Sequence, residues 1–397
     1  MKIRRLPVWL LAALPACAMA ASFNVTVTHD LETARPGETI VIPFSAVRER
    51  LPGVLFDHVA VRNTATGKLV PAQVTNFNPD DRAALYDDLV WQHDFGAGER
   101  EARFTVETTE APVPPWPAQV FARHVPERLD DFAFENDRIA HRIYGPGLDT
   151  EAAGKSRMIG SGIDVWAKRV RYPIVDRWYL KGHDAYHIDS GEGLDFYSAG
   201  TARGMGGTAV WRDGQLHTSH NWEAWRVLAN GPIRAVFELT YAPWDAGNGV
   251  MVSEKKRFTV DAGRNLHRID SSYATTPAGA DFTLAIGLGK HEKPAPNPVA
   301  SHSVDGRWLS VWETYLKADE AQLGTAVVLA DELTPRFTED ANNFLMLVPA
   351  QGGATITYHA GAGWTRSGDF ADRAAWEAYV ADFAKRLQHP ISIHIQP

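Results

Sequence analysis

The sequence predicts a mainly β protein in two parts, with one C-terminal helix. Short stretches of alternating apolar and polar residues recur along most of the 397 residues, and turns rich in Gly and Pro separate them. A proline-rich stretch, 111–118, breaks this pattern once and should form a stiff linker. Only residues 372–387 carry apolar side chains at helical spacing.

The first twenty residues have the pattern of a secretory signal peptide. Basic residues precede an apolar run, and Ala18-Met19-Ala20 offers a cleavage site after residue 20. We therefore expect a periplasmic or secreted protein. The alternative is a lipoprotein anchored to a membrane through Cys17, although Pro15 fits that signal poorly. No later apolar run reaches the ~20 residues that a transmembrane helix needs.

Composition excludes several classes of function. Cys17 is the only cysteine, so residues 21–397 can hold no disulfide, thiolate nucleophile or cysteine-ligated metal. The formal net charge of −8, with no basic run to offset it, argues against nucleic acid and anionic membrane surfaces as partners. The 13 tryptophans favour an oligosaccharide or polysaccharide partner, because aromatic faces stack on sugar rings. Nothing in the sequence indicates an oligomeric state.

Residues 21–110 predict a small N-terminal β-sandwich. Its expected strands lie near residues 23–27, 40–44, 59–61, 89–91 and 104–106. We find no convergent set of acids and bases in this part. The linker 111–118 then marks the domain boundary.

Residues 119–397 predict a second β domain that ends in a helix. Its expected strands are 139–144, 163–170, 224–227, 233–241, 251–260, 266–275, 282–287, 308–315, 324–329, 344–348 and 354–360. The helix 372–387 has Asp369 and Asp372 available to cap its start, and Pro390 stops it. A closing strand, 391–395, follows.

The segment 177–211 is the candidate reaction centre. It combines acids, bases and donors with seven glycines before residue 208, and aromatic residues are interleaved with them. That mixture is typical of a ligand pocket built on exposed connections. The competing interpretation is a solvated Gly-rich loop.

Three motifs resemble a known family. They are 134–140 (FENDRIA) followed by 142–146 (RIYGP), 162–166 (GIDVW), and the 186–193 cluster of Tyr186, His187, Asp189 and Glu192 with two glycines. In these motifs the chain resembles the domain of unknown function 4861 family, through most of residues 120–390. The resemblance implies a large antiparallel β-supersandwich similar to galactose mutarotase, and secreted proteins associated with breakdown of pectin-like polysaccharides.

The favoured chemistry is β-elimination on a uronate-containing oligosaccharide. This reaction needs a base for the proton beside the carboxylate, an acid for the leaving oxygen, and a cation for the carboxylate. We expect His183 or His187 as the base and Tyr186 as the acid or its partner. Lys181, Arg203 or Arg142 would neutralise the carboxylate. The wider set of candidate substrate-binding residues adds Tyr144, Asp189, Trp222, His291 and Trp364.

Other functions remain open from the sequence. A mutarotase or epimerase would pair a histidine with Glu192 or Glu254, whereas a hydrolase needs two carboxylates from Asp189, Asp195, Glu192, Glu223 and Glu254. A non-catalytic carbohydrate-binding protein is the opposing class.

No cofactor is required by the sequence. The alternative is a divalent metal held by His183, His187 and Asp189 on one face of an extended segment, with a further ligand such as His220 or His291.

Overall fold

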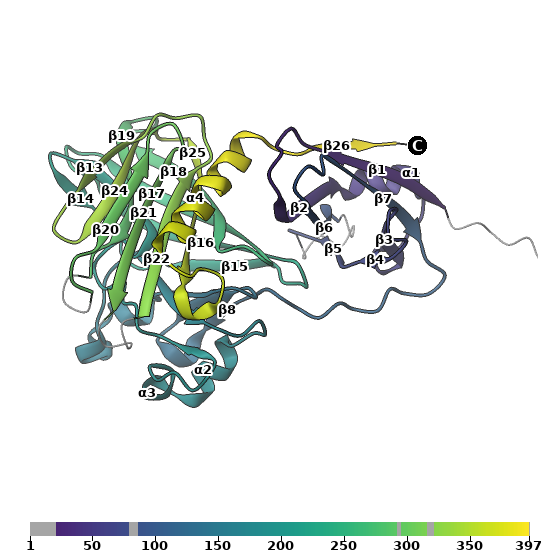
Figure 1. The fold of residues 1–397 in the computed structure, drawn as a ribbon. Helices are drawn as coiled ribbons and strands as arrows, with labels where there is room; N and C mark the ends of the chain where they lie inside the picture. Colours follow the sequence, from purple (N-terminus) through teal and green to yellow (C-terminus); the bar gives the residue numbers. More distant parts are fainter. Residues whose placement is uncertain (1–20, 79–85, 292–294, 316–320, 397) are drawn as a thin grey trace, which may run out of the picture.

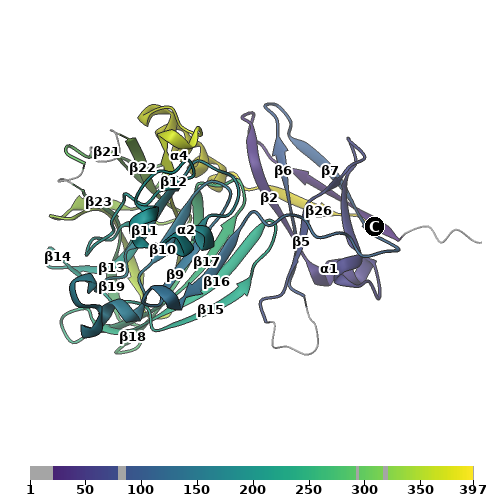
Figure 2. The same cartoon turned by 90° about the horizontal axis from the view of Figure 1, so that it is seen from below.

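The computed structural model describes residues 21–78, 86–291, 295–315 and 321–396. The expected signal peptide, residues 1–20, and Cys17 within it lie outside this range. The described chain forms a small and a large β-sandwich that lie side by side (Figures 1 and 2). The mainly β fold with a C-terminal helix is therefore confirmed.

The small sandwich packs a five-stranded sheet against a three-stranded one. The first sheet has the order β26-β1-β7-β3-β4 and the second β2-β6-β5. Alternation buries one face of each sheet, and Val25, Ile40, Trp91 and Phe104 meet in a common core. The elements are β1 (Ser22–Thr28), β2 (Arg35–Pro43), α1 (Phe44–Arg50), β3 (Val59–Asn63), β4 (Leu69–Val70), β5 (Ala72–Thr75), β6 (Asp88–Phe95), β7 (Glu101–Thr108) and β26 (Ser392–Ile395).

The last strand belongs by hydrogen bonding to the first sheet. β26 pairs antiparallel with β1, with Val25 opposite Ile395, and its isoleucines pack on the small core. A domain drawn as 119–397 would have placed this strand in the large sandwich. The chain thus crosses between the sandwiches twice, once through residues 109–120, which carry no helix or strand, and once before β26 (Figure 1).

One layer of the large sandwich is an eight-stranded antiparallel sheet. Its order is β15-β16-β17-β18-β25-β22-β21-β20. The strands are β15 (Ala224–Ala229), β16 (Arg234–Asp245), β17 (Met251–Asp261), β18 (Leu266–Thr276), β20 (Val299–Ser303), β21 (Trp308–Tyr315), β22 (Ala321–Leu329) and β25 (Thr355–Trp364).

The facing layer consists of two five-stranded sheets, ordered β12-β11-β10-β9-β8 and β14-β13-β19-β24-β23. A parallel bridge between Ile163 and Gly204 joins them. Phe132 stacks on Phe237 of the opposite layer and Phe134 packs tilted against Phe258, so one core fills the sandwich. The strands are β8 (Phe121–Val125), β9 (Asp131–Glu135), β10 (Ala140–Ile143), β11 (Ile163–Lys168), β12 (Gly193–Leu194), β13 (Met205–Arg212), β14 (Gln215–His217), β19 (Asp281–Gly289), β23 (Arg336–Glu339) and β24 (Asn343–Gln351).

The glycine run 204–207 allows close packing at the place where the two five-stranded sheets meet each other and the eight-stranded sheet. Gly206 has a φ of +90°, and a Cβ there would lie 2.5 Å from the Ala360 Cβ in the opposite sheet. The close approach lets Tyr358 donate a hydrogen bond to the Gly206 carbonyl. The prediction of an active-site loop is therefore wrong for this part of the segment. These residues lead into β13 and form its start, and they are glycines because another part of the chain packs directly against their backbone.

Helix α4 (Arg373–Gln388) covers the outer face of the eight-stranded sheet (Figure 1). Its Asp372 cap accepts a hydrogen bond from the Ala375 amide, as the sequence predicts. Trp376 is fully buried and lies on Gly324, and its indole donates to Ser310. The apolar stripe is thus structural.

Candidate functional site

A buried arginine gathers three aspartates at the edge of the large sandwich. Arg142 on β10 lies opposite Asp164 on β11, and its Nη2 donates to Asp164 at 2.5 Å and to Asp195 at 3.1 Å. Asp131, at the start of β9, lies 3.9 Å away. Three strands and the residue that follows β12 therefore supply one charged cluster. We call it the Arg142 cluster: Arg142, Asp131, Asp164 and Asp195.

Aromatic rings keep water from this cluster. The Arg142 guanidinium lies 5.3 Å from the ring centroids of Tyr144 and Trp166. The Tyr186 hydroxyl lies 3.4 Å from Nη1, and its ring packs on Trp166. Exclusion of water strengthens every electrostatic interaction at this point.

Burial changes the protonation of the aspartates. It raises the pKa of Asp131 to about 6, even though Arg142 and Arg128 oppose that shift. Burial also raises the pKa of Asp195 well above its usual range, again against the pull of Arg142. Burial thus favours the protonated form of both carboxyls, and the charge of Arg142 opposes it.

His187 is the histidine that the structure brings to the cluster. Its Nδ1 lies 2.7 Å from the His183 carbonyl, which can only accept, so Nδ1 carries the proton. Nε2 is then a free base, 3.5 Å from Asp195 Oδ2. Burial lowers the pKa of His187, which keeps the ring neutral. Its side chain is 40% exposed and so can meet a ligand.

Arg128 is a second cation at the cluster, and sequence reasoning missed it. Its Nε lies 3.8 Å from Asp131, while Nη1 is buried and has no hydrogen-bond partner in the described chain. Burial raises the pKa of Tyr186, and the charges of Arg142 and Arg128 partly offset that rise. Nothing around residue 128 in the sequence marks it, because the β8–β9 connection brings it there.

The first part of segment 177–211 is helical, contrary to the expected loop. Helices α2 (Val175–Lys181) and α3 (His183–Tyr186) form because Glu135 accepts the Ile174 and Val175 amides, and because Trp178 and Tyr186 pack on Trp166. The extended segment assumed for a metal site is therefore absent here. No group of three or more His, Asp or Glu side chains in the described chain could hold a metal ion.

Several predicted residues lie outside the Arg142 cluster, near the surface. His183 is exposed and pairs with Asp184. Lys181 forms an ion pair with Glu192. Burial raises the pKa of Glu192, but hydrogen bonds from Lys181, Arg177 and Tyr172 outweigh burial and lower this pKa to about 2. Asp189 accepts the amides of residues 191 and 193 and pairs with Arg169, so it shapes a turn. His220 pairs with Asp149.

Glu254 and Arg203 lie buried inside the large sandwich. Glu254 pairs with Lys256 at 3.0 Å and accepts the Thr208 hydroxyl at 2.7 Å. Arg203 donates to Ser161 and to the Thr208 carbonyl. Both are expected site residues, but each is at most 2% exposed and has its partners within the core.

The remaining predicted residues are also buried. His291 bridges Glu313 and the Ser198 carbonyl, and these contacts raise its pKa although burial lowers it. Of the expected rim loop that follows it, residues 292–294 lie outside the described chain. Trp364 is 0% and Trp222 2% exposed, so neither ring presents a free face to a sugar.

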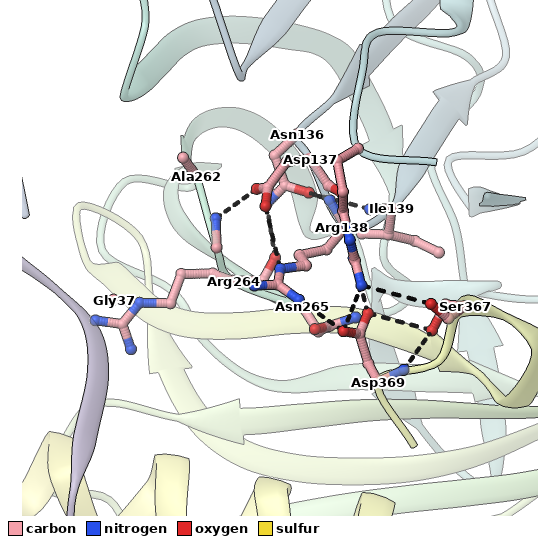
Figure 3. Close-up of polar contacts among 12 residues, drawn as sticks. Gly37, Asn136, Asp137, Arg138, Ile139, Ala262, Arg264, Asn265, Ser367 and Asp369 are labelled. Atoms are coloured by element: carbon pink, nitrogen blue, oxygen red, sulfur yellow. Dashed lines mark hydrogen bonds and ion pairs between the residues drawn. The ribbon is translucent and has the colours of Figure 1, made fainter. Parts of the chain in front are cut away.

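The FENDR motif at 134–138 is architectural. Asn136 donates to the Asp261 and Arg264 carbonyls, and Asp137 accepts the Gly263 amide. Arg138 binds Asp369 at 2.6 Å. Figure 3 shows these contacts tying the β9–β10 turn to the β17–β18 turn and to the segment before α4.

None of the helices in the described part of the chain is long and apolar enough to cross a membrane.

Comparison with known proteins gives one relative and several distant structures. The relative, "Uncharacterized protein P7" from Formosa agariphila, is 31% identical over 383 residues, which cover 94% of this chain and 93% of P7. Two solved structures from Enterococcus faecalis, an alpha-mannosidase and a protein in glycosyl hydrolase family 38, each match 95% of this chain at 9% identity. Their TM-scores are 0.49 and 0.48, and this chain spans about half of their length, 46% and 48%.

The family comparison covers both sandwiches. The model of the family described as "Domain of unknown function (DUF4861)" matches residues 27–393, which run from β1 to β26. The resemblance carried by the three sequence motifs is therefore confirmed over nearly the whole chain, and this protein belongs to the DUF4861 family.

Proposed function

We propose that this protein is a carbohydrate-active enzyme that cleaves uronate-containing oligosaccharides by β-elimination at the Arg142 cluster. The observation that carries the proposal is the fixed tautomer of His187, which leaves Nε2 as a base beside buried proton donors. Export directed by the expected signal peptide, residues 1–20, would place the reaction in the periplasm or outside the cell.

His187 takes the proton from the carbon beside the substrate carboxylate. The electron pair forms a carbon–carbon double bond, and the bond to the leaving glycosidic oxygen breaks. Tyr186 protonates that oxygen, since its raised pKa keeps the phenol protonated until then. The two residues are neighbours, with ring centroids 4.8 Å apart.

Arg128 neutralises the substrate carboxylate. Arg142 is the poorer choice, because Asp164 and Asp195 already occupy its Nη2. The Arg128 side chain is 21% exposed, and its guanidinium offers the substrate a charge-assisted hydrogen bond that would stabilise the negative charge developing during proton abstraction.

Hydrolysis is the second candidate, because Asp164 and Asp195 share one Arg142 nitrogen. A neutral Asp195 would act as the acid and Asp164 as the nucleophile or base. The two reactions differ in their products. Elimination gives an unsaturated end that absorbs ultraviolet light, whereas hydrolysis adds one water.

The test incubates residues 21–397 with pectic, alginate and glucuronan oligosaccharides and follows mass and absorbance. H187A should lower turnover by about 100-fold or more. H183A is the matched control, because it removes an exposed ring but keeps the carbonyl that orients His187.

Each outcome decides between the candidates. Unsaturated fragments with a selective loss in H187A support the lyase, and fragments with added water transfer the assignment to hydrolysis. Unchanged masses together with sugar binding would indicate a binding protein, or a mutarotase or epimerase, and NMR of the anomeric protons separates these two. Equal losses in H183A and H187A would refute the role of His187.

A further inference from the structure

A cavity of about 240 Å³ lies between the two sandwiches and is lined by arginines from both. Arg35 and Glu38 on β2 form the wall from the small sandwich. Arg264, Arg268 and His359 belong to the large one. We infer that this cavity, which we call the inter-sandwich cavity, binds a small oxyanion, either a free sulfate or phosphate ion or the carboxylate or sulfate group of a sugar.

The charges around the cavity do not balance. Five arginines line it, and four of them have a close carboxylate partner, in the pairs Arg35–Glu38, Arg234–Asp261, Arg268–Asp270 and Arg386–Asp382. Arg264 is the fifth. Its nearest carboxylate is Glu38 at 3.6 Å, which Arg35 already binds at 3.0 Å. One positive charge is thus in excess.

The guanidinium of Arg264 lines the cavity and has N–H groups that are open to a ligand. Its side chain is 12% exposed and lies over the Phe383 ring at 5.8 Å. Within the described chain its five N–H groups donate no hydrogen bond to a side chain or carbonyl. Figure 3 shows the side chain leaving the Asn136–Asp369 network and extending toward Gly37 of the small sandwich. A planar guanidinium with several N–H donors in a nearly buried cavity is well suited to bind an oxyanion.

His359 supplies a second unsatisfied group. It is 9% exposed, lines the same cavity, and its Nδ1 has no hydrogen-bond partner in the described chain. Burial and the charges of Arg268 and Arg264 lower the pKa of His359 to about 3, so the ring is neutral. A bound anion would provide both an acceptor and a compensating negative charge.

The size of the cavity selects a small ligand. Pockets for drug-sized molecules hold roughly 300–1,000 Å³, so this one suits an ion or one charged group with part of a sugar ring. An anion held by Arg264 would also attract Arg35 on the wall from the small sandwich, where Arg35 already pairs with Glu38. Binding would therefore fix the small sandwich against the large one.

The experiment measures binding to residues 21–397 by calorimetry and by the increase in Tm. The probes are sulfate, phosphate and galacturonate, with neutral galactose as the control for non-ionic effects. R264Q should weaken anion binding at least tenfold. R103Q is the matched control, because Arg103 is an exposed arginine on β7 whose side chain is 67% exposed.

R264K separates charge from geometry, because it keeps the positive charge but loses the planar fork, and it should bind with intermediate affinity. The NMR signals of the His359 ring provide a readout that does not depend on stability, and they should shift on titration with anion in the wild type but not in R264Q. R268Q serves if R264Q does not fold.

Binding of all three anions supports a general oxyanion site, and binding of sulfate and phosphate alone assigns it to free ions. Equal effects of galactose and galacturonate, or unchanged affinity in R264Q, would overturn the inference. The test of anion binding is independent of the test of the proposed reaction. H187A should retain anion binding, and R264Q should retain oligosaccharide cleavage.

Discussion

Arg142 Nε and Nη2 both point at one oxygen of Asp164, at 3.1 and 2.5 Å, across adjacent strands β10 and β11. The second edge of the guanidinium is left for Asp195 and Tyr186. Burial lowers the pKa of Arg142, but Asp164 and Asp195 outweigh burial and raise it, so the arginine stays charged. This cation is the reason that three aspartates can be buried together.

Removing that cation should destabilise the fold. R142M would leave the buried Asp164 carboxylate without its ion-pair partner, and breaking a buried ion pair typically costs about 3–5 kcal/mol. Urea unfolding followed by tryptophan fluorescence measures the change. R103M, on an exposed arginine, should change stability by no more than about 0.5 kcal/mol. Similar values for the two variants would contradict the structural role of Arg142.

Asp131 should make stability depend on pH. Burial raises its pKa from 3.8 to about 6, so the folded protein binds this proton at higher pH than the unfolded chain does. Its contribution to stability is therefore greatest below pH 3.8 and declines as the pH rises to about 6. D131N removes the titration, so the stability of the variant relative to wild type should increase over this range. Unfolding free energies of both proteins at about pH 4, 5, 6 and 7 would show this increase, and a constant difference would refute the shift.

Gly145 should tolerate no side chain. A Cβ there would lie 1.6 Å from the Asp130 carbonyl oxygen, so the backbone would have to move. We expect G145A to lose about 3 kcal/mol or more. G96A is the matched control, since its Cβ would meet nothing nearer than the Glu99 carboxylate at 3.7 Å. Thermal unfolding of both variants measures the difference, and equal Tm values would show that the 130–145 contact is loose.

Trp364 should contribute to stability and not to sugar binding. The ring is fully buried and packs near Phe196, with Arg169 at 5.7 Å from its centroid. W364A should lose about 3–5 kcal/mol, as large-to-small changes in cores do, while W364F should lose less. Calorimetry with an oligosaccharide then gives the affinity of folded W364F. A large loss of affinity at nearly unchanged stability would restore the expected role as a sugar platform.

Local patterns allowed much of the fold to be predicted. Helix α4 follows from the spacing of its apolar side chains and from Asp372, and most strands follow from alternation. The glycine run was misinterpreted because the sequence does not show what approaches a backbone. Only the structure shows that Ala360 of a distant strand occupies the space beside Gly206.

The site could be predicted only in part. Arg142, Tyr186 and His187 were expected, and the structure brings them together. Arg128 and Asp131 were missed, because one lies in the β8–β9 connection and the other at the start of β9, and they share no local motif with the other residues of the cluster. Convergence of this kind depends on strand order, which a single sequence does not give.

The return of β26 to the edge of β1 has a mechanical consequence. A domain held by one linker can rotate in any direction. Two covalent connections at separate places restrict the domain mainly to rotation about the line that joins them. The segment 109–120 and the stretch between α4 and β26 form such a pair. Any relative motion of the sandwiches would therefore be mainly a rotation about that line, and it would change the distance or the register between the two walls of the inter-sandwich cavity.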